Sequence, residues 1–229
     1  MRTMWKYAPK WLKKFKTCSH FLFTFRNLTR EQLDSIRSLH RRNWEEPSPR
    51  IVKDFVLAKW GGRGVWIETG TYYGETTEML ARIAQKVYSI EPSFEFVELA
   101  KKKFMSVDSV SILPGTSEQV LGNLLSQIIK NETLDISFWL DGHYSEGNTF
   151  LGENETPIVQ ELDAISGFIP RFSEITILID DVRCFRPQIP RWRSYPDLNY
   201  LVSWANKQGL FWTIEHDIFI MTNRNLEAL

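Results

Sequence analysis

The chain has 229 residues, of which 43% are hydrophobic and 24% are charged, and its 28 Lys and Arg residues balance 28 Asp and Glu residues. This composition indicates an ordinary soluble globular chain long enough for one large α/β domain, and it contains no run of about 18 apolar residues that would predict a membrane-spanning helix. Two cysteines, Cys18 and Cys184, exclude a disulfide framework and a cysteine-based zinc site, and they favour the reducing cytoplasm.

The charge is unevenly distributed along the chain. Residues 1–30 hold eight Lys and Arg residues and no acid, so the remainder carries 20 basic and 28 acidic residues, a balance of −8. We therefore expect no nucleic-acid partner for that acidic body. Residues 1–48 are predicted to form a basic N-terminal helical segment. Its first stretch, "MRTMWKYAPKWLKKFK", either packs on its own domain with a solvated basic face or contacts a membrane surface or a partner.

In chain order, the first predicted elements are helices. "LTREQLDSIRSLHRRNW" is amphipathic, with Thr29 as its N-cap and Gln32 at the capping-box position, and "IVKDFVLAKW" predicts a second helix after "EEPSPR". From there short apolar runs alternate with helix-like stretches that begin near Thr76, Ser93, Ser117 and Thr156. The apolar runs are "GVWIE", "KVYSIE", "VSILPG", "ISFWLD" and "ITILID".

This alternation predicts a parallel sheet covered by helices on both faces. The last two runs, "LFWTIEH" and "IFIMT", are too close together for a crossover helix and predict an antiparallel hairpin. The expected fold of residues 49–229 is therefore α/β, a doubly wound Rossmann-like sheet of five parallel strands plus a C-terminal antiparallel hairpin, preceded by N-terminal helices.

Four of the five predicted parallel strands end in an acid. These residues are Glu68, Glu91, Asp141 and Asp180 together with Asp181. Because ligands bind outside the carboxyl ends of the strands in open α/β sheets, we expect these side chains to converge on one crevice. The adjacent pair Asp180–Asp181 needs a nearby positive charge, which a metal ion, a cationic ligand or a basic side chain can supply.

The first strand runs into "ETGTYYGETT", where Gly70 and Gly74 allow a tight turn and a close approach of a ligand to the backbone. Glu91 follows 17 residues after Gly74, at a strand end where an acid can bind both hydroxyls of a ribose. The loop is not G-x-G-x-x-G, and Tyr72 and Tyr73 fill it, which argues against a pyrophosphate site.

The motifs "VWIETGTYYGETT", "VYSIEPS", "ILPGTSEQVL" and "FWLDGHYSEGNT" resemble the successive motifs of class I S-adenosylmethionine (SAM)-dependent methyltransferases over about residues 50–222. "LDGHY" followed by "LIDD" is similar to the metal-dependent O-methyltransferases, including the macrocin-type sugar O-methyltransferases and, more distantly, catechol O-methyltransferase. The resemblance implies that SAM is held by Glu68, Gly70, Thr71, Tyr72, Gly74, Glu91, Ser117 and Asp141.

The same resemblance implies a metal site formed by Asp141, Asp180 and Asp181. Three carboxylates without a thiol favour a hard cation, Mg²⁺ or alternatively Ca²⁺ or Mn²⁺, which would acidify and orient a substrate hydroxyl. The alternative is that Asp180 accepts hydrogen bonds from the cofactor or a helix N-terminus while Asp181 faces water.

Asp141 and His143 are the candidate catalytic residues. His143 lies two residues beyond Asp141, and its imidazole suits proton removal from a hydroxyl, with Tyr144 as a substitute; the alternative for His143 is a surface role. After the fifth strand Arg183, Arg186, Arg191 and Arg193 either bind an anionic group of the substrate or form a solvated loop, and we expect Cys184 to be inert packing.

The sequence favours an O-methyltransferase that acts on a hydroxyl of a sugar or related small molecule, with a homo-oligomer as an open possibility. One alternative is a non-catalytic protein that keeps the fold and binds partners. The other, a nicotinamide-dependent oxidoreductase, requires a glycine loop that the sequence lacks and has no use for three clustered aspartates.

Overall fold

The computed structural model describes residues 47–130, 135–142 and 156–224. The predicted helix that follows Thr29, the rest of the basic segment, His143 and Tyr144 lie outside the described residues, so those predictions are not tested. The boundary between residues 48 and 49 also remains a prediction.

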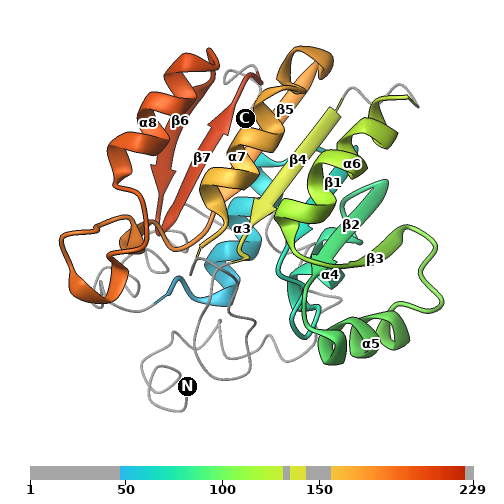
Figure 1. Ribbon diagram of the computed structural model, residues 1–229. Helices are drawn as coiled ribbons and strands as arrows, with labels where there is room; N and C mark the ends of the chain where they lie inside the picture. Colours follow the sequence, from blue (N-terminus) through green and yellow to red (C-terminus); the bar gives the residue numbers. More distant parts are fainter. Residues whose placement is uncertain (1–46, 131–134, 143–155, 225–229) are drawn as a thin grey trace, which may run out of the picture.

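A seven-stranded sheet with the order β3-β2-β1-β4-β5-β7-β6 forms the centre of the molecule (Figure 1). Its strands are β1 (Val65–Thr69), β2 (Lys86–Glu91), β3 (Val110–Pro114), β4 (Asp135–Leu140), β5 (Glu174–Ile179), β6 (Phe211–Glu215) and β7 (Ile218–Thr222). Strands β1 to β5 pair in parallel, whereas β7 pairs antiparallel with both β5 and β6. This arrangement confirms the predicted doubly wound, methyltransferase-type Rossmann-like sheet.

The helices follow the predicted alternation. They are α3 (Arg50–Trp60), α4 (Glu75–Leu80), α5 (Phe94–Lys103), α6 (Ser117–Ile129), α7 (Ile158–Ser166) and α8 (Leu198–Lys207). Three 3₁₀ turns, Ile169–Arg171, Val182–Cys184 and Pro190–Trp192, complete the described elements. The starts of α4 to α7 lie within two residues of the predicted positions, but α8 and the 3₁₀ turns were not predicted.

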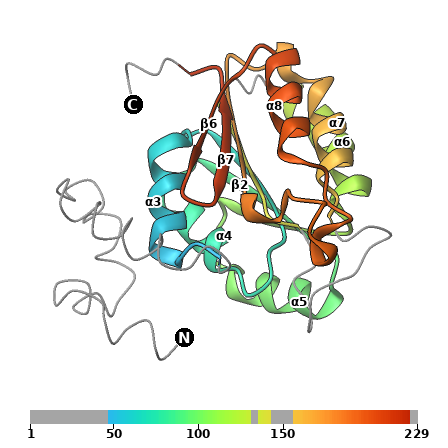
Figure 2. The ribbon, with the colours of Figure 1, turned by 90° about the vertical axis from the view of Figure 1, so that its left-hand side faces the viewer.

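Helices cover both faces of the sheet (Figure 2). Helices α3 and α4 lie on one face, and α6, α7 and α8 lie on the other. Side chains therefore alternate between two hydrophobic cores: Phe138 and Leu140 of β4 pack toward α6 and α7, whereas Trp139 between them packs toward α3. Burial on both faces explains why the strand sequences are nearly continuous apolar runs.

The C-terminal hairpin has the short connection that the sequence predicted. Only His216 and Asp217 separate β6 from β7, and Glu215 pairs with Ile218 across the turn. His216 has a positive φ of 59°, as the first residue of a two-residue hairpin turn commonly has. The turn therefore places Asp217 next to the end of β5, where the Asp217 carbonyl accepts a hydrogen bond from the amide of Val182. Asp217 is part of the candidate site.

Among the described residues, no helix has the length and apolar character needed to cross a membrane.

Candidate functional site

The carboxyl ends of β1, β4 and β5 lie side by side in register. Thr69 is paired with Leu140, and Leu140 with Ile179. The ladder continues one residue past the strands, because the amide of Asp141 donates to the Thr69 carbonyl at 3.2 Å and the amide of Asp180 donates to the Leu140 carbonyl at 3.1 Å. The predicted strand-end acids Asp141 and Asp180 are therefore neighbours.

The direction of these two side chains follows from strand alternation. Trp139 and Leu178, two residues before Asp141 and Asp180, both pack in the core beneath α3. Residues i and i+2 of a strand share a face, so Asp141 and Asp180 both extend toward α3 rather than toward α7. This face also carries Glu68 of β1, whose strand neighbours are Ser89 and Trp139.

The loop after β1 has the tight geometry that its glycines predicted. Gly70 has a φ of 87°, and a Cβ atom at this position would lie 2.7 Å from the carbonyl oxygen of Asp141. Gly74 has a φ of 68° and caps α4, while its amide donates to the Thr71 carbonyl at 2.8 Å. Gly70 thus lets the β1 loop approach the β4 loop at the carboxyl edge of the sheet.

Glu91 joins this loop to the end of β2. Its carboxylate accepts one hydrogen bond from the amide of Tyr72 and one from the amide of Ser93, both at 2.9 Å, and the residue is buried. Each carboxylate oxygen has a second acceptor position, so two backbone bonds leave Glu91 able to bind ligand hydroxyls. The predicted ribose-binding position therefore lies beside the glycine loop.

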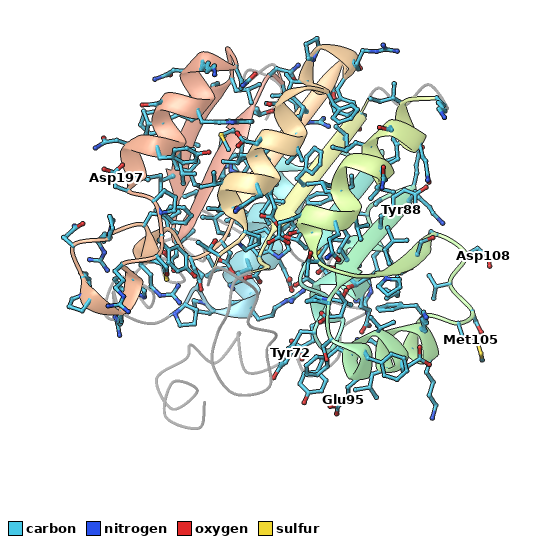
Figure 3. The ribbon with its side chains drawn as sticks, in the orientation of Figure 1. Tyr72, Tyr88, Glu95, Met105, Asp108 and Asp197 are labelled. Atoms are coloured by element: carbon cyan, nitrogen blue, oxygen red, sulfur yellow. The ribbon has the colours of Figure 1, made fainter. Side chains whose placement is uncertain are left out.

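The side chain of Tyr72 lies near α5 (Figure 3). It packs against Tyr73 and Phe96 at centroid separations of 4.3 and 4.6 Å, and Tyr72 and Tyr73 are about half exposed. The two tyrosine rings of this loop therefore form a small exposed aromatic surface beside the candidate site. The loop backbone faces the interior, where the Tyr72 amide contacts Glu91.

Glu68 lies at the floor of the site and is fully buried. Its Oε2 atom accepts hydrogen bonds from the Thr77 hydroxyl at 2.5 Å and the Ser89 hydroxyl at 2.6 Å, and Thr71 extends the network through Ser89 at 2.6 Å. Burial raises the pKa of Glu68 to about 7, although the two hydroxyl donors oppose the shift. Thr71, predicted as a cofactor-binding residue, is buried in this network.

Lys53 of α3 provides the positive charge beside Asp180. Its Nζ atom forms an ion pair with Asp180 Oδ2, and Asp180 is only 2% exposed. Burial lowers the pKa of Lys53, but the carboxylates of Asp180, Asp141 and Asp181 outweigh that effect and raise its pKa above the ordinary value. The ammonium therefore stays charged at neutral pH.

Arg183 provides the second positive charge. Its guanidinium pairs with Asp181 Oδ1 at 2.5 Å and also with Asp217 Oδ2, and its amide donates to Asp217 Oδ1 at 2.8 Å. Burial raises the pKa of Asp217 to about 6, while Arg183 opposes the shift. Asp181, which adopts a left-handed backbone with φ of 57°, is therefore buried in an ion-pair network rather than facing water.

These two basic side chains pair with two of the three carboxylates that were predicted to bind a metal ion. Among the described residues, no three His, Cys, Asp or Glu side chains are grouped so that they could hold a metal ion. Asp180 and Asp181 instead turn one oxygen each to Lys53 and Arg183. The donor set does not fit a divalent ion in this arrangement, so the structure does not support the predicted metal site.

Several buried polar atoms at the carboxyl edge of the sheet have no hydrogen-bond partner among the described residues. They include Glu68 Oε1, Thr69 Oγ1 and Asp180 Oδ1, all at the carboxyl ends of β1 and β5. Leaving such atoms unpaired costs free energy, and a polar ligand offsets that cost when it binds. These atoms can accept hydrogen bonds from a ligand at this edge of the sheet.

The structure also places Ser117, Cys184 and two of the predicted arginines. Ser117 is the buried first residue of α6, next to the end of β3. Cys184 is buried, and burial raises the pKa of its thiol to about 12, which agrees with inert packing. Arg186 and Arg191 lie over the Trp192 ring, with guanidinium carbons 4.7 and 4.1 Å from its centroid.

Sequence reasoning missed Lys53, Thr77, Ser89 and Asp217. For Lys53 a signal existed: it precedes Val56, Leu57 and Trp60 by three, four and seven residues, so a lysine falls on the apolar stripe of an amphipathic helix. For Asp217 the sequence offered only a hairpin turn, and its contact with Arg183 spans 34 residues.

No protein-family model and no curated protein matches this chain. Among solved structures, an O-methyltransferase from Bacillus cereus in complex with SAH has a TM-score of 0.48 and 18% identity, covering 85% of this chain and 91% of its own. The N-methyltransferase NodS from Bradyrhizobium japonicum WM9 has a TM-score of 0.46 and 15% identity, covering 74% and 89%. An rRNA methylase from Streptococcus thermophilus has a TM-score of 0.42 and 13% identity, covering 76% and 94%.

These three likenesses have TM-scores below 0.5 and identities of 18% or less, so they say nothing about activity or acceptor. The fold assignment rests on the strand order and on the antiparallel β7.

Proposed function

We propose that this chain is a SAM-dependent methyltransferase that methylates a hydroxyl oxygen of a small molecule, a sugar or a related natural product. The observation that carries the proposal is the position of Glu91, buried beside the Gly70 loop at the carboxyl edge of the sheet. An acid there suits the two hydroxyls of a ribose, and the loop brings backbone close to the same ligand.

The charge of the crevice supports a cationic cofactor. Acids outnumber bases among its described residues even without Glu68, whose raised pKa favours the protonated form: Glu91, Asp141, Asp180, Asp181 and Asp217 stand against Lys53 and Arg183. A sulfonium and an ammonium group are favourable neighbours for such a surface, whereas a pyrophosphate is not. This difference, together with the missing G-x-G-x-x-G loop, ranks the nicotinamide-dependent oxidoreductase lower.

Each residue has a separate task in the proposed reaction. Glu91 holds the ribose; Gly70, Thr71, Tyr72 and Gly74 shape the loop around the ligand; Glu68 and Ser117 complete the floor and the β3 side. When bound, SAM supplies a methyl group on a sulfonium that is already activated for transfer. The chain must then hold the acceptor oxygen in line and accept its proton.

Asp141 and His143 are the proposed catalytic residues. Asp141 lies at the end of β4 between Gly70 and Asp180, close to where an acceptor oxygen would approach. His143, two residues further, is proposed to accept the hydroxyl proton, because an imidazole is a base of suitable strength near pH 7. Mg²⁺ assistance, which the sequence resemblance implied, is not part of this proposal because the donor set does not fit.

A labelled methyl group on SAM tests the proposal. We expect the protein to transfer the label to hydroxyl-bearing sugars or related natural products from a panel, and His143→Ala to slow transfer by about 10²- to 10⁴-fold while SAM binding is kept. The panel should include RNA, because the absence of a nucleic-acid partner is inferred only from the −8 charge of residues 31–229.

Two outcomes would contradict the proposal. SAM binding without turnover on any acceptor favours the non-catalytic alternative, and label on RNA alone would move the acceptor from small molecules to nucleic acid. The cytoplasmic location also remains a prediction.

A further inference from the structure

We propose that the ammonium of Lys53 occupies, in the acceptor site, the position beside Asp180 that a divalent metal ion would otherwise take. Removing that ammonium converts the aspartate cluster, which consists of Asp141, Asp180 and Asp181, into a site for a divalent cation. The part of the inference that concerns turnover rests on the proposed function. The part that concerns cation binding does not, because it follows from the charges of the described residues alone.

The first support is the placement of Lys53. It extends from α3 to the carboxyl edge of the sheet, where its Nζ atom pairs with Asp180 Oδ2 and lies 5.9 Å from the centre of the Trp139 ring. The lysine side chain is 17% exposed and the Asp180 side chain is fully buried. The ammonium is therefore partly exposed, whereas the carboxylate that it pairs with is buried.

The second support is that α3 is fixed, so Lys53 is not a mobile surface side chain. Val52, Val56 and Leu57 of the same helix are fully buried. Arg50 ties the start of the helix to α4, donating to the Thr76 hydroxyl at 2.7 Å and to the Glu75 carbonyl at 2.9 Å. A lysine on an anchored helix holds its charge in one place, as a bound ion does.

The third support is the distribution of charge. Arg183 is committed to Asp181 and Asp217 on the far side of the cluster. Among the residues that the structure describes, Lys53 is thus the cation that pairs with Asp180.

The consequence of removing Lys53 follows from the Asp180 oxygens. Within the described part of the chain Oδ1 already has no hydrogen-bond partner, and Oδ2 would lose its ion pair. A buried carboxylate in that state must take up a proton or a cation. Asp141 and Asp180 occupy adjacent strand ends, so both offer oxygen ligands of the kind that Mg²⁺, Ca²⁺ and Mn²⁺ bind.

The test is a titration of Mn²⁺ alone, without SAM, into the wild-type protein and four variants, followed by calorimetry and thermal unfolding. Lys53→Met removes the charge. Lys53→Arg keeps it. Lys53→Met/Asp180→Asn removes the charge together with its buried partner. Lys59→Met is the matched control, because Lys59 belongs to the same helix but pairs with Glu215 at 2.8 Å instead of with Asp180.

We expect Lys53→Met to bind one Mn²⁺ at least tenfold more tightly than the wild type and to gain thermal stability when Mn²⁺ is added. Lys53→Arg and Lys59→Met should bind as weakly as the wild type, and the Asp180→Asn change should cancel the gain. If Lys53→Met is unfolded in metal-free buffer, recovery of the fold on addition of Mn²⁺ supports the proposal, and failure to recover overturns it.

Two further results would overturn the proposal. One is a wild-type protein that binds a single Mn²⁺ as tightly as Lys53→Met, because the metal would then displace the lysine. The other is a folded Lys53→Met protein without any gain in affinity.

Turnover provides the second readout. Wild-type methyl transfer should be unchanged in EDTA, whereas transfer by Lys53→Met should fall and recover in part with Mn²⁺. Wild-type transfer that stops in EDTA contradicts the inference. If no protein transfers methyl groups at all, the proposed function fails, while the Mn²⁺ titration still decides the role of Lys53.

Discussion

Glu68 is a single buried carboxyl that makes the stability of the folded protein depend on pH. It is fully buried, accepts two hydroxyl hydrogen bonds on one oxygen and leaves the other without a partner. Its pKa rises from an ordinary 4.5 to about 7 because burial penalises the charged form. Between these two pH values the folded protein holds a proton that the unfolded chain releases, so the contribution of Glu68 to stability falls as pH rises from 4.5 to 7.

Glu68→Gln tests this linkage, because the amide keeps a hydrogen-bond acceptor but does not titrate. We expect the difference in unfolding free energy between the variant and the wild type to shift in favour of the variant by on the order of 3 kcal/mol from about pH 4.5 to about pH 7. Urea unfolding at several pH values measures the difference, in which the other titrating groups cancel. A difference independent of pH would mean that Glu68 titrates as an exposed carboxyl does.

At the scale of elements, the loop between β1 and α4 determines how closely two strand ends approach. Gly70 combines a positive φ with a carbonyl oxygen only 2.7 Å from the point where a Cβ atom would lie, so an added side chain meets a backbone group that cannot rotate away. Gly122 in α6 has a helical backbone and nothing within 4 Å of the same position.

Opposite results are therefore expected from two chemically identical substitutions. Gly70→Ala should lower the free energy of unfolding by more than about 1 kcal/mol and weaken SAM binding, because the loop must move away from Asp141. Gly122→Ala should raise the free energy of unfolding by about 0.5–1 kcal/mol, because alanine is the better helix former, and should leave SAM binding unchanged. Chemical denaturation and calorimetry provide both readouts; a Gly70→Ala protein with wild-type stability and affinity would contradict the described loop geometry.

At the scale of the whole molecule, the sequence was sufficient for the sheet and for the position of the strand-end acids of the candidate site. Strands buried on both faces leave continuous apolar runs, and parallel strands place their carboxyl ends at one edge, so Glu68, Glu91, Asp141 and Asp180 could be brought together without a structure. Helix α8 was missed because only the arginine-rich stretch directly after β5 was interpreted, and no element was predicted for residues 198–207.

The rest of the site depends on contacts that local patterns do not encode. Lys53 reaches Asp180 across 127 positions, and that contact follows from how α3 packs on the sheet. A basic side chain was among the candidate counterions for the aspartate pair, but the family resemblance favoured Mg²⁺. The described residues instead pair Asp180 with Lys53 and Asp181 with Arg183.

Calorimetric titration of SAH, the demethylated product of SAM, tests the central claim most directly. In buffer that contains EDTA, we expect the wild-type protein to bind SAH at one site and not to bind NAD. Glu91→Ala should weaken SAH binding by about 1.5–3 kcal/mol, roughly 10- to 150-fold, because the ribose loses hydrogen bonds to a charged acceptor. Glu98→Ala, which removes an exposed acid of α5, should bind SAH as the wild type does. Binding of NAD but not SAH by the folded wild-type protein, or unchanged SAH affinity in Glu91→Ala, would contradict the account.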